Sequence, residues 1–166
     1  MAIELLNRLA MFVALFVAQV LILNHVHLFD VATPLLYVYF AITFHRGFPK
    51  WIMLLSCFLL GLVIDIFSST PGLAAGCMTL VAFVQPYVLE TVVPRDSAAD
   101  LEVSLKSLGT NKFCFLSSVI TVFFCLLFFA VEAFSFFDWL VWLERAFTSA
   151  VLTWILMMAI ESVRSR

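Results

Sequence analysis

Residues 113–134 read FCFLSSVITVFFCLLFFAVEAF, and Glu132 is the only charged residue among them. An α-helix of this length extends about 33 Å at ~1.5 Å per residue, enough to cross a hydrocarbon core of about 30 Å. The apolar residues form one continuous run, whereas the strands of a membrane barrel alternate apolar and polar positions. The stretch therefore predicts a transmembrane helix.

The whole chain has the composition of this stretch. Of its 166 residues, 64% are hydrophobic and 12% are charged, and the mean hydropathy is +1.14. Soluble domains are about 45–50% apolar and about 25% charged. We therefore expect an all-α integral membrane protein with a single transmembrane domain over residues 1–166. The net charge of −2 gives no reason to expect binding to nucleic acid.

Apolar runs separated by turn formers and charges predict a bundle of six transmembrane helices. The second run is the weakest, because Pro34–Phe44 alone is too short to cross the membrane and must borrow neighbouring residues. If it is a re-entrant segment, five spans remain. The predicted spans are about 9–28, 31–48, 51–67, 72–93, 113–134 and 139–163.

The basic residues predict the orientation, because cytoplasmic loops of membrane proteins carry an excess of Lys and Arg. With the N-terminus inside, eight of the nine basic residues are cytoplasmic and only Arg145 lies near the outer face. Both termini are therefore expected in the cytoplasm. The eight are Arg8, Arg46, Lys50, Arg95, Lys106, Lys112, Arg164 and Arg166.

The cytoplasmic loop 94–112 carries a pattern of its own. Ser97 begins a motif like a capping box, and Gly109 is a plausible helix stop. Leu101, Leu105 and Leu108 share one helical face. We interpret residues 98–108 as a short amphipathic helix that docks on the membrane surface or on a partner. An ordinary polar linker is the alternative.

Polar side chains gather at the outer ends of the predicted spans. Arg145 can pair with Glu132 or Glu144, and Asp65 can reach His25 or a helix N-terminus. Such groups are costly in lipid and usually face the bundle interior. Since no catalytic or metal-binding motif is present, we expect polar contacts or a ligand or partner pocket, with no cofactor, metal or catalytic residue. The cluster comprises Asn24, His25, Asp65, Glu132 and Arg145.

Small residues at intervals of four mark positions where helices approach closely. Contact within this chain is the plain interpretation of each, and contact with a different protein is the alternative. The first set is Ala10, Ala14 and Ala18, and the second is Gly72 and Gly76.

Gly61 and Asp65 lie four residues apart, so they share one helix face and that face should point into the bundle. Our hypothesis is that Asp65 joins the outer ends of spans one and three through Asn24 or His25. Pro86 should kink the fourth span, with Gln85 or Thr91 bonding to the carbonyl that Pro86 releases.

Several short motifs follow one another in a fixed order. They are Gln19-Val-Leu-Ile-Leu-Asn24-His25, Pro34 with Tyr37, Gly61-Leu-Val-Ile-Asp65-Ile-Phe67, Pro71-Gly72-Leu-Ala-Ala, and Tyr87. Together they resemble the MreD family of bacterial rod shape-determining proteins over residues 15–90. The Asn-His element resembles the Bacteroidetes-like branch of that family.

The resemblance implies a six-helix fold like that of the substrate-binding subunits of energy-coupling-factor transporters. It implies a non-enzymatic subunit of the cell-wall elongation complex in the bacterial inner membrane. It also implies binding to MreC, and through MreC to an actin-like filament protein, a SEDS-type glycosyltransferase and a transpeptidase. Two alternatives stay open: a transporter substrate-binding subunit, and a small membrane enzyme that uses the outer polar cluster.

The predicted orientation can be tested with reporter fusions along the chain. Fusions at residues 30, 70 and 137 should report an external position, and fusions at residues 48, 103 and 166 a cytoplasmic one, because the basic residues divide in this way. An external C-terminus would contradict the prediction.

Overall fold

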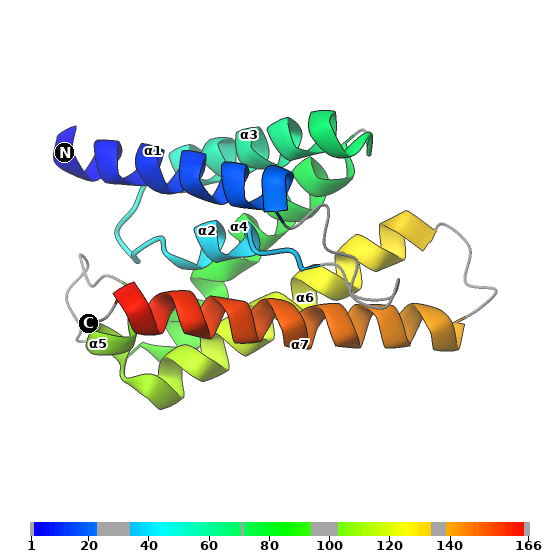
Figure 1. The fold of residues 1–166 in the computed structure, drawn as a ribbon. Helices are drawn as coiled ribbons and strands as arrows, with labels where there is room; N and C mark the ends of the chain where they lie inside the picture. Colours follow the sequence, from blue (N-terminus) through cyan, green and yellow to red (C-terminus); the bar gives the residue numbers. More distant parts are fainter. Residues whose placement is uncertain (1, 23–33, 71, 94–102, 134–138, 165–166) are drawn as a thin grey trace.

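The computed structural model describes residues 2–22, 34–70, 72–93, 103–133 and 139–164, and these residues form only helices and turns. The helices pack side by side into one bundle (Figure 1). They are α1 (Ala2–Val17), the π-helical η1 (Ala18–Ile22), α2 (Val38–Ile42), α3 (Lys50–Ser68), α4 (Leu73–Val92), α5 (Leu105–Leu108), α6 (Thr110–Ala133) and α7 (Trp139–Arg164).

Four helices, α3, α4, α6 and α7, are long and apolar enough to cross a membrane. Their outward faces carry large exposed apolar side chains such as Ile66, Phe83, Phe115 and Phe147. Water is a poor solvent for such a surface, and lipid is a good one. The protein is therefore an all-helical membrane protein that crosses the bilayer more than once.

The N-terminal helix begins earlier than the predicted first span. Helix α1 starts at Ala2 and η1 continues it to Ile22, whereas hydropathy places the start of the span near residue 9. Hydropathy marks the part that fits the hydrocarbon core, and the helical backbone extends beyond it through Asn7 and Arg8. Residues 23–28 of this predicted span lie outside the described residues.

The predicted second span does not form one continuous helix. Between Pro34 and Pro49 only α2, five residues long, is α-helical, although every residue from Pro34 to Phe44 is buried. This buried segment, residues 34–44, lies inside the bundle with α1 on one side and α7 on the other (Figure 1). The count of six spans stays a prediction.

Side chains from the surrounding helices bond to the backbone of the buried segment. Gln19 of η1 donates from Nε2 to the carbonyl of Pro34 at 3.0 Å and accepts at Oε1 from the N–H of Leu36 at 3.1 Å. The Leu35 N–H donates to Thr153 Oγ1 of α7 at 3.0 Å. These bonds replace the ones that a helix would make, so the irregular backbone is not left unpaired away from water.

The other end of the segment is held in the same way. Arg8 of α1 donates from Nη1 to the carbonyl of Thr43 at 3.0 Å, and Gln85 of α4 donates from Nε2 to the carbonyl of Phe44 at 3.1 Å. Both carbonyls are buried. Side chains of α1 and the adjoining η1, of α4 and of α7 therefore converge on one short segment.

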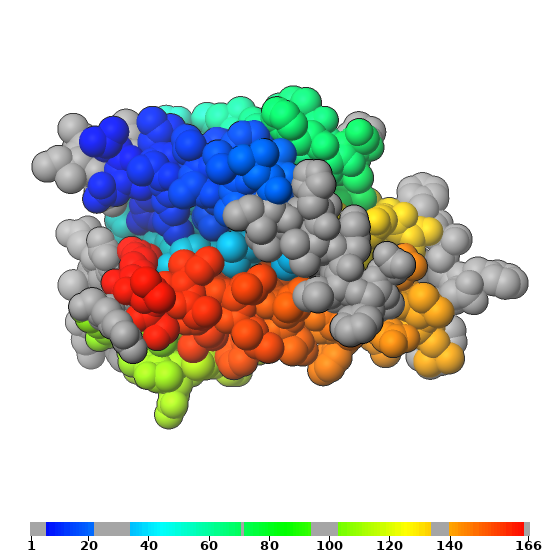
Figure 2. Space-filling view, viewed as in Figure 1, coloured from blue at the N-terminus to red at the C-terminus, as the bar shows by residue number. Residues whose placement is uncertain are grey.

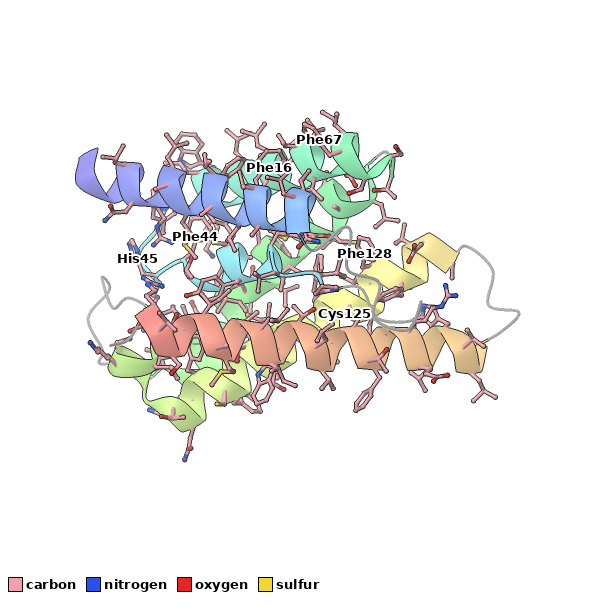
Figure 3. The ribbon with its side chains drawn as sticks, viewed as in Figure 1. Phe16, Phe44, His45, Phe67, Cys125 and Phe128 are labelled. Atoms are coloured by element: carbon pink, nitrogen blue, oxygen red, sulfur yellow. The ribbon has the colours of Figure 1, made fainter. Side chains whose placement is uncertain are left out.

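Aromatic pairs join α1 and the buried segment to the rest of the bundle. Phe16 of α1 packs on Phe67 of α3 with ring centroids 5.3 Å apart, and the labels in Figure 3 mark the pair. Tyr37 packs edge-on against Phe124 of α6 at 5.3 Å. Such pairs contribute about 0.5–1.5 kcal/mol beyond the burial of their area.

Helices α3 and α4 approach each other closely at Gly61. A Cβ atom on Gly61 would lie 2.5 Å from the Cα of Ala75 and 2.7 Å from the carbonyl oxygen of Ala74. The prediction of a close helix approach at Gly61 is confirmed, and its partners are the small residues of α4.

The start of α1 and the end of α7 lie at the same end of the bundle (Figure 1). That both termini lie on the cytoplasmic side of the membrane stays a prediction.

Replacement of Gly61 by Ala should destabilise the protein by about 1–3 kcal/mol, because a methyl group at 2.5 Å from backbone forces α3 and α4 apart. Gly76→Ala is the matched control, since nothing lies within 4 Å of its Cβ position. Thermal unfolding of the purified protein in detergent measures both. Equal unfolding temperatures for the two variants would contradict the packing account.

Candidate functional site

A groove runs along the molecule between α1 and α7, and the buried segment forms its floor. It encloses about 530 Å³. Figure 2 shows it on the near face, where the segment is visible between α1 (blue) and α7 (red). The lining residues are Asn7, Arg8, Ala10, Met11, Ala14, Leu15, Ala18, Leu36, Tyr39, Thr43, Ile160 and Arg164.

Arg8 forms one side of the charged end of the groove. Besides the carbonyl of Thr43, its Nη1 donates to Thr43 Oγ1 at 3.2 Å. Its guanidinium lies over the ring of Phe44 at 4.7 Å and near the ring of Phe48 at 5.5 Å. Stacking and hydrogen bonding together fix the plane of this cation.

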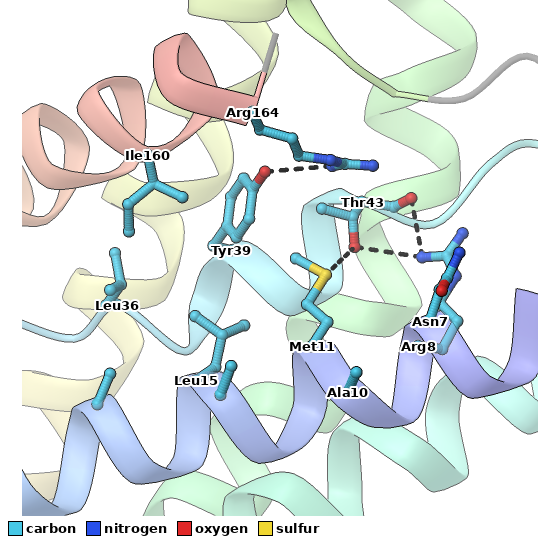
Figure 4. A pocket seen from close by; sticks show the side chains of 12 residues that line it. Asn7, Arg8, Ala10, Met11, Leu15, Leu36, Tyr39, Thr43, Ile160 and Arg164 are labelled. Carbon is cyan, nitrogen blue, oxygen red and sulfur yellow. Dashed lines mark hydrogen bonds between the residues drawn. The ribbon is translucent and has the colours of Figure 1, made fainter. Parts of the chain in front are cut away.

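Arg164 forms the other side, as part of a cluster with Tyr39 and Glu161 (Figure 4 labels Arg164 and Tyr39). Its Nη1 donates to the Tyr39 hydroxyl at 3.2 Å and lies 3.7 Å from Glu161 Oε2. Tyr39 in turn donates its hydroxyl hydrogen to Glu161. Glu161 is 0% exposed and also accepts from the Leu105 N–H at 3.2 Å. A buried carboxylate is tolerated here because it is paired and hydrogen-bonded.

The ridge Ala10, Ala14 and Ala18 faces this groove. Ala10 and Ala14 are exposed, and Ala18 is half-buried. In the described residues the ridge is therefore not a site of close helix contact within the chain, and the plain interpretation of this spacing is wrong. The alternative, contact with a different protein, stays a prediction.

Helix α7 carries a buried polar stripe that is not among the features predicted from the sequence. Ser149, Thr153 and Glu161 all have 0% exposure, as does Met157 between them. Residues four apart lie on one helix face, so this spacing was the signal that could have found the stripe. Two residues of the stripe bond to the buried segment. Thr153 accepts from the Leu35 N–H, and Glu161 accepts from the Tyr39 hydroxyl. The expectation that intramembrane polar groups lie mostly in the outer half is incomplete.

Asp65 caps the N-terminus of α4 from the end of α3. Its Oδ1 accepts from the Ala74 N–H at 2.8 Å and from Thr70 Oγ1 at 3.0 Å, and its Oδ2 accepts from the Ala75 N–H at 2.9 Å. A carboxylate suits the partial positive charge at a helix N-terminus. Of the two partners predicted for Asp65, the helix N-terminus is confirmed.

The rest of the outer polar cluster is only partly described. Asn24 and His25 lie outside the described residues, so the predicted link from Asp65 to either one stays a prediction. Glu132 and Arg145 are both exposed, at the end of α6 and near the start of α7, and interact electrostatically.

The pair Gly72 and Gly76 does not form a helix contact in the described residues. Neither Cβ position has an atom within 4 Å, and both residues are exposed. Gly72 instead has a φ of 82°, which favours glycine, where the chain turns into α4. Contact within the chain is therefore the wrong interpretation of this motif.

Pro86 lies inside α4, as predicted, but the two expected partners for the carbonyl it releases bond elsewhere. Gln85 donates to the carbonyl of Phe44, and Thr91 Oγ1 donates to the carbonyl of Val88 at 2.7 Å. Gln85 is thus a support for the buried segment and not for its own helix.

The predicted amphipathic helix over residues 98–108 is too long. Ser104 is extended and caps a helix of four residues, α5, while Gly109 ends it as expected. Leu105 and Leu108 pack against the core of this protein and not outward. Leu101 and the predicted cap at Ser97 lie outside the described residues.

Within the described part of the chain, no group of three or more His, Cys, Asp and Glu side chains could hold a metal ion. Gln19, Gln85 and Thr153 bond to backbone, and Asp65 caps a helix. Comparisons with models of protein families, with characterised proteins and with solved structures find no match for the chain.

Asp65→Leu should destabilise the protein strongly, because it leaves the buried N–H groups of Ala74 and Ala75 without acceptors at about 1–3 kcal/mol each. Asp65→Asn keeps one acceptor oxygen and should lose about 1 kcal/mol. Protein level in the membrane and thermal unfolding in detergent measure the order. If Asp65→Asn abolishes function at normal level and stability, the carboxylate has a chemical role that capping does not explain.

Proposed function

We propose that this protein is a non-enzymatic subunit of the cell-wall elongation complex in the bacterial inner membrane, similar to the MreD family. It binds MreC, and through MreC the filament protein, glycosyltransferase and transpeptidase of that complex. It has six spans arranged like a transporter substrate-binding subunit, with both termini in the cytoplasm.

One observation carries this proposal. Three of the residues on which the resemblance rests, Gln19, Gly61 and Asp65, have structural roles in the bundle. Gln19 clamps the buried segment next to Pro34, Gly61 lets α3 meet α4, and Asp65 caps α4. Motifs with structural roles of this kind are shared by proteins that share a fold, so the resemblance supports a common architecture.

The use made of polar side chains in the described interior also favours an assembly subunit over an enzyme. Gln19, Gln85 and Thr153 each bond to the backbone of the buried segment. A catalytic group must instead be within reach of a substrate in a cleft. The outer polar cluster, on which an enzyme would depend, contributes Asp65 to a helix cap.

A transporter substrate-binding subunit is the second candidate. The exposed Ala10 and Ala14 at the groove between α1 and α7 favour it, because a small-residue ridge permits close docking of another membrane protein.

The two candidates are distinguished by purification from native membrane under mild detergent, with the recovered proteins identified by mass spectrometry. If the protein is an assembly subunit, an MreC-type protein and wall synthases should co-purify with it. Depletion of the protein in cells should then turn rods into round cells. An equally abundant membrane protein with the same tag is the control. Recovery of transporter ATPases, or of a tightly bound vitamin, would contradict the proposal.

A further inference from the structure

From the groove between α1 and α7 we infer that the protein binds one anionic phospholipid, with an acyl chain along the ridge of small residues and the headgroup phosphate at Arg8 and Arg164. The inference goes beyond the proposed assembly role, and it stands whichever complex the chain joins.

The polarity of the groove changes along its length as that of a lipid does. One end is lined by Asn7, Arg8, Thr43 and Arg164 (Figure 4). Further along, the lining is apolar and consists of Ala14, Leu15, Ala18, Leu36 and Ile160. A soluble ligand of one polarity would not match both ends, whereas a phospholipid has a charged head and an apolar tail.

The part of α1 that lines the groove is about as long as the hydrocarbon layer of one leaflet is thick. Arg8 and Ala18 are ten residues apart on one helix, or about 15 Å at ~1.5 Å per residue. Half of a hydrocarbon core of ~30 Å is also about 15 Å. When Arg8 lies at headgroup level, Ala18 therefore lies near the middle of the bilayer, where an acyl chain ends.

The charge of the polar end selects an anionic headgroup. Among the described residues that line the groove, the charged ones are Arg8 and Arg164, and both are at this end. Glu161 lies 3.7 Å from Arg164, behind the groove lining. Basic pockets between transmembrane helices bind anionic lipid headgroups, and guanidinium suits the geometry of a phosphate.

The size of the groove fits a single acyl chain. The groove holds about 530 Å³. This volume lies in the range of about 300–1,000 Å³ that is usual for small-molecule sites, which a single lipid chain also fits.

Native mass spectrometry of the full chain in detergent, titrated with phosphatidylglycerol or phosphatidylcholine, tests the inference. Phosphatidylglycerol should bind about tenfold more tightly, because each arginine at the headgroup contributes a several-fold preference for an anionic lipid. Arg164→Gln should reduce that preference about fivefold. Glycerol phosphate alone should not compete, because it lacks the acyl chain.

Ala14→Trp places a large side chain in the groove from an exposed position. It should lower the affinity for phosphatidylglycerol about tenfold or more, because the indole ring displaces the acyl chain of the lipid from the groove. Val13→Trp is the matched control, since Val13 is exposed on the same helix and does not line the groove. Thermal unfolding verifies that both variants are folded. Ala10→Phe, also at an exposed groove position, replaces Ala14→Trp if that variant is unstable.

Three results would overturn the lipid site. The first is equal binding of the two lipids by the unmodified chain. The second is unchanged phosphatidylglycerol binding by Ala14→Trp, and in that case loss of a co-purifying membrane protein from the same variant would assign the groove to a partner helix. The third is full competition by glycerol phosphate, which would reduce the site to one for a soluble anion.

Discussion

Hydrogen bonding of an irregular backbone inside the bundle is the constraint on which the rest of the structure depends. Residues 34–44 are all buried, and only α2 supplies helical bonds among them. In hydrocarbon an unpaired N–H or C=O costs several kcal/mol, so the bundle has to provide partners. It does so from α1, η1, α4 and α7, and the polar side chains of these helices are placed where the segment needs them. The positions of Gln19, Gln85 and Thr153 follow from that need.

The groove is a consequence of the same arrangement. The groove is lined by α1, α7 and the buried segment that lies between them. Arg8 and Arg164 reach inward to bond with Thr43 and Tyr39 of the segment, and this brings two cations to one end of the groove. The feature that stabilises the interior thus also shapes the surface that an outside molecule meets.

Hydropathy alone predicts the four long helices, because a run of about twenty apolar residues has few other stable forms in lipid. The Gly61–Asp65 spacing likewise predicts an inward face with close packing. The buried segment could not be found in this way, since a buried irregular segment and a buried helix have the same apolar composition. Gly72 was misread because its spacing to Gly76 is that of a packing motif, while its φ of 82° shows a turn. The stripe from Ser149 to Glu161 could have been found from its spacing of four.

The hydrogen-bond partners of the buried segment come from distant parts of the sequence, and this affects the order in which the protein assembles. Residues 34–44 leave the ribosome soon after Arg8 and Gln19, whereas Thr153 and Glu161 follow their partners Leu35 and Tyr39 by 118 and 122 residues. The N–H of Leu35 and the hydroxyl of Tyr39 bond to residues of α7 in the folded structure. The segment can therefore make these bonds only after α7 has been inserted. Premature termination within α7 would therefore leave the centre of the protein unassembled, although every earlier helix had already been delivered to the bilayer.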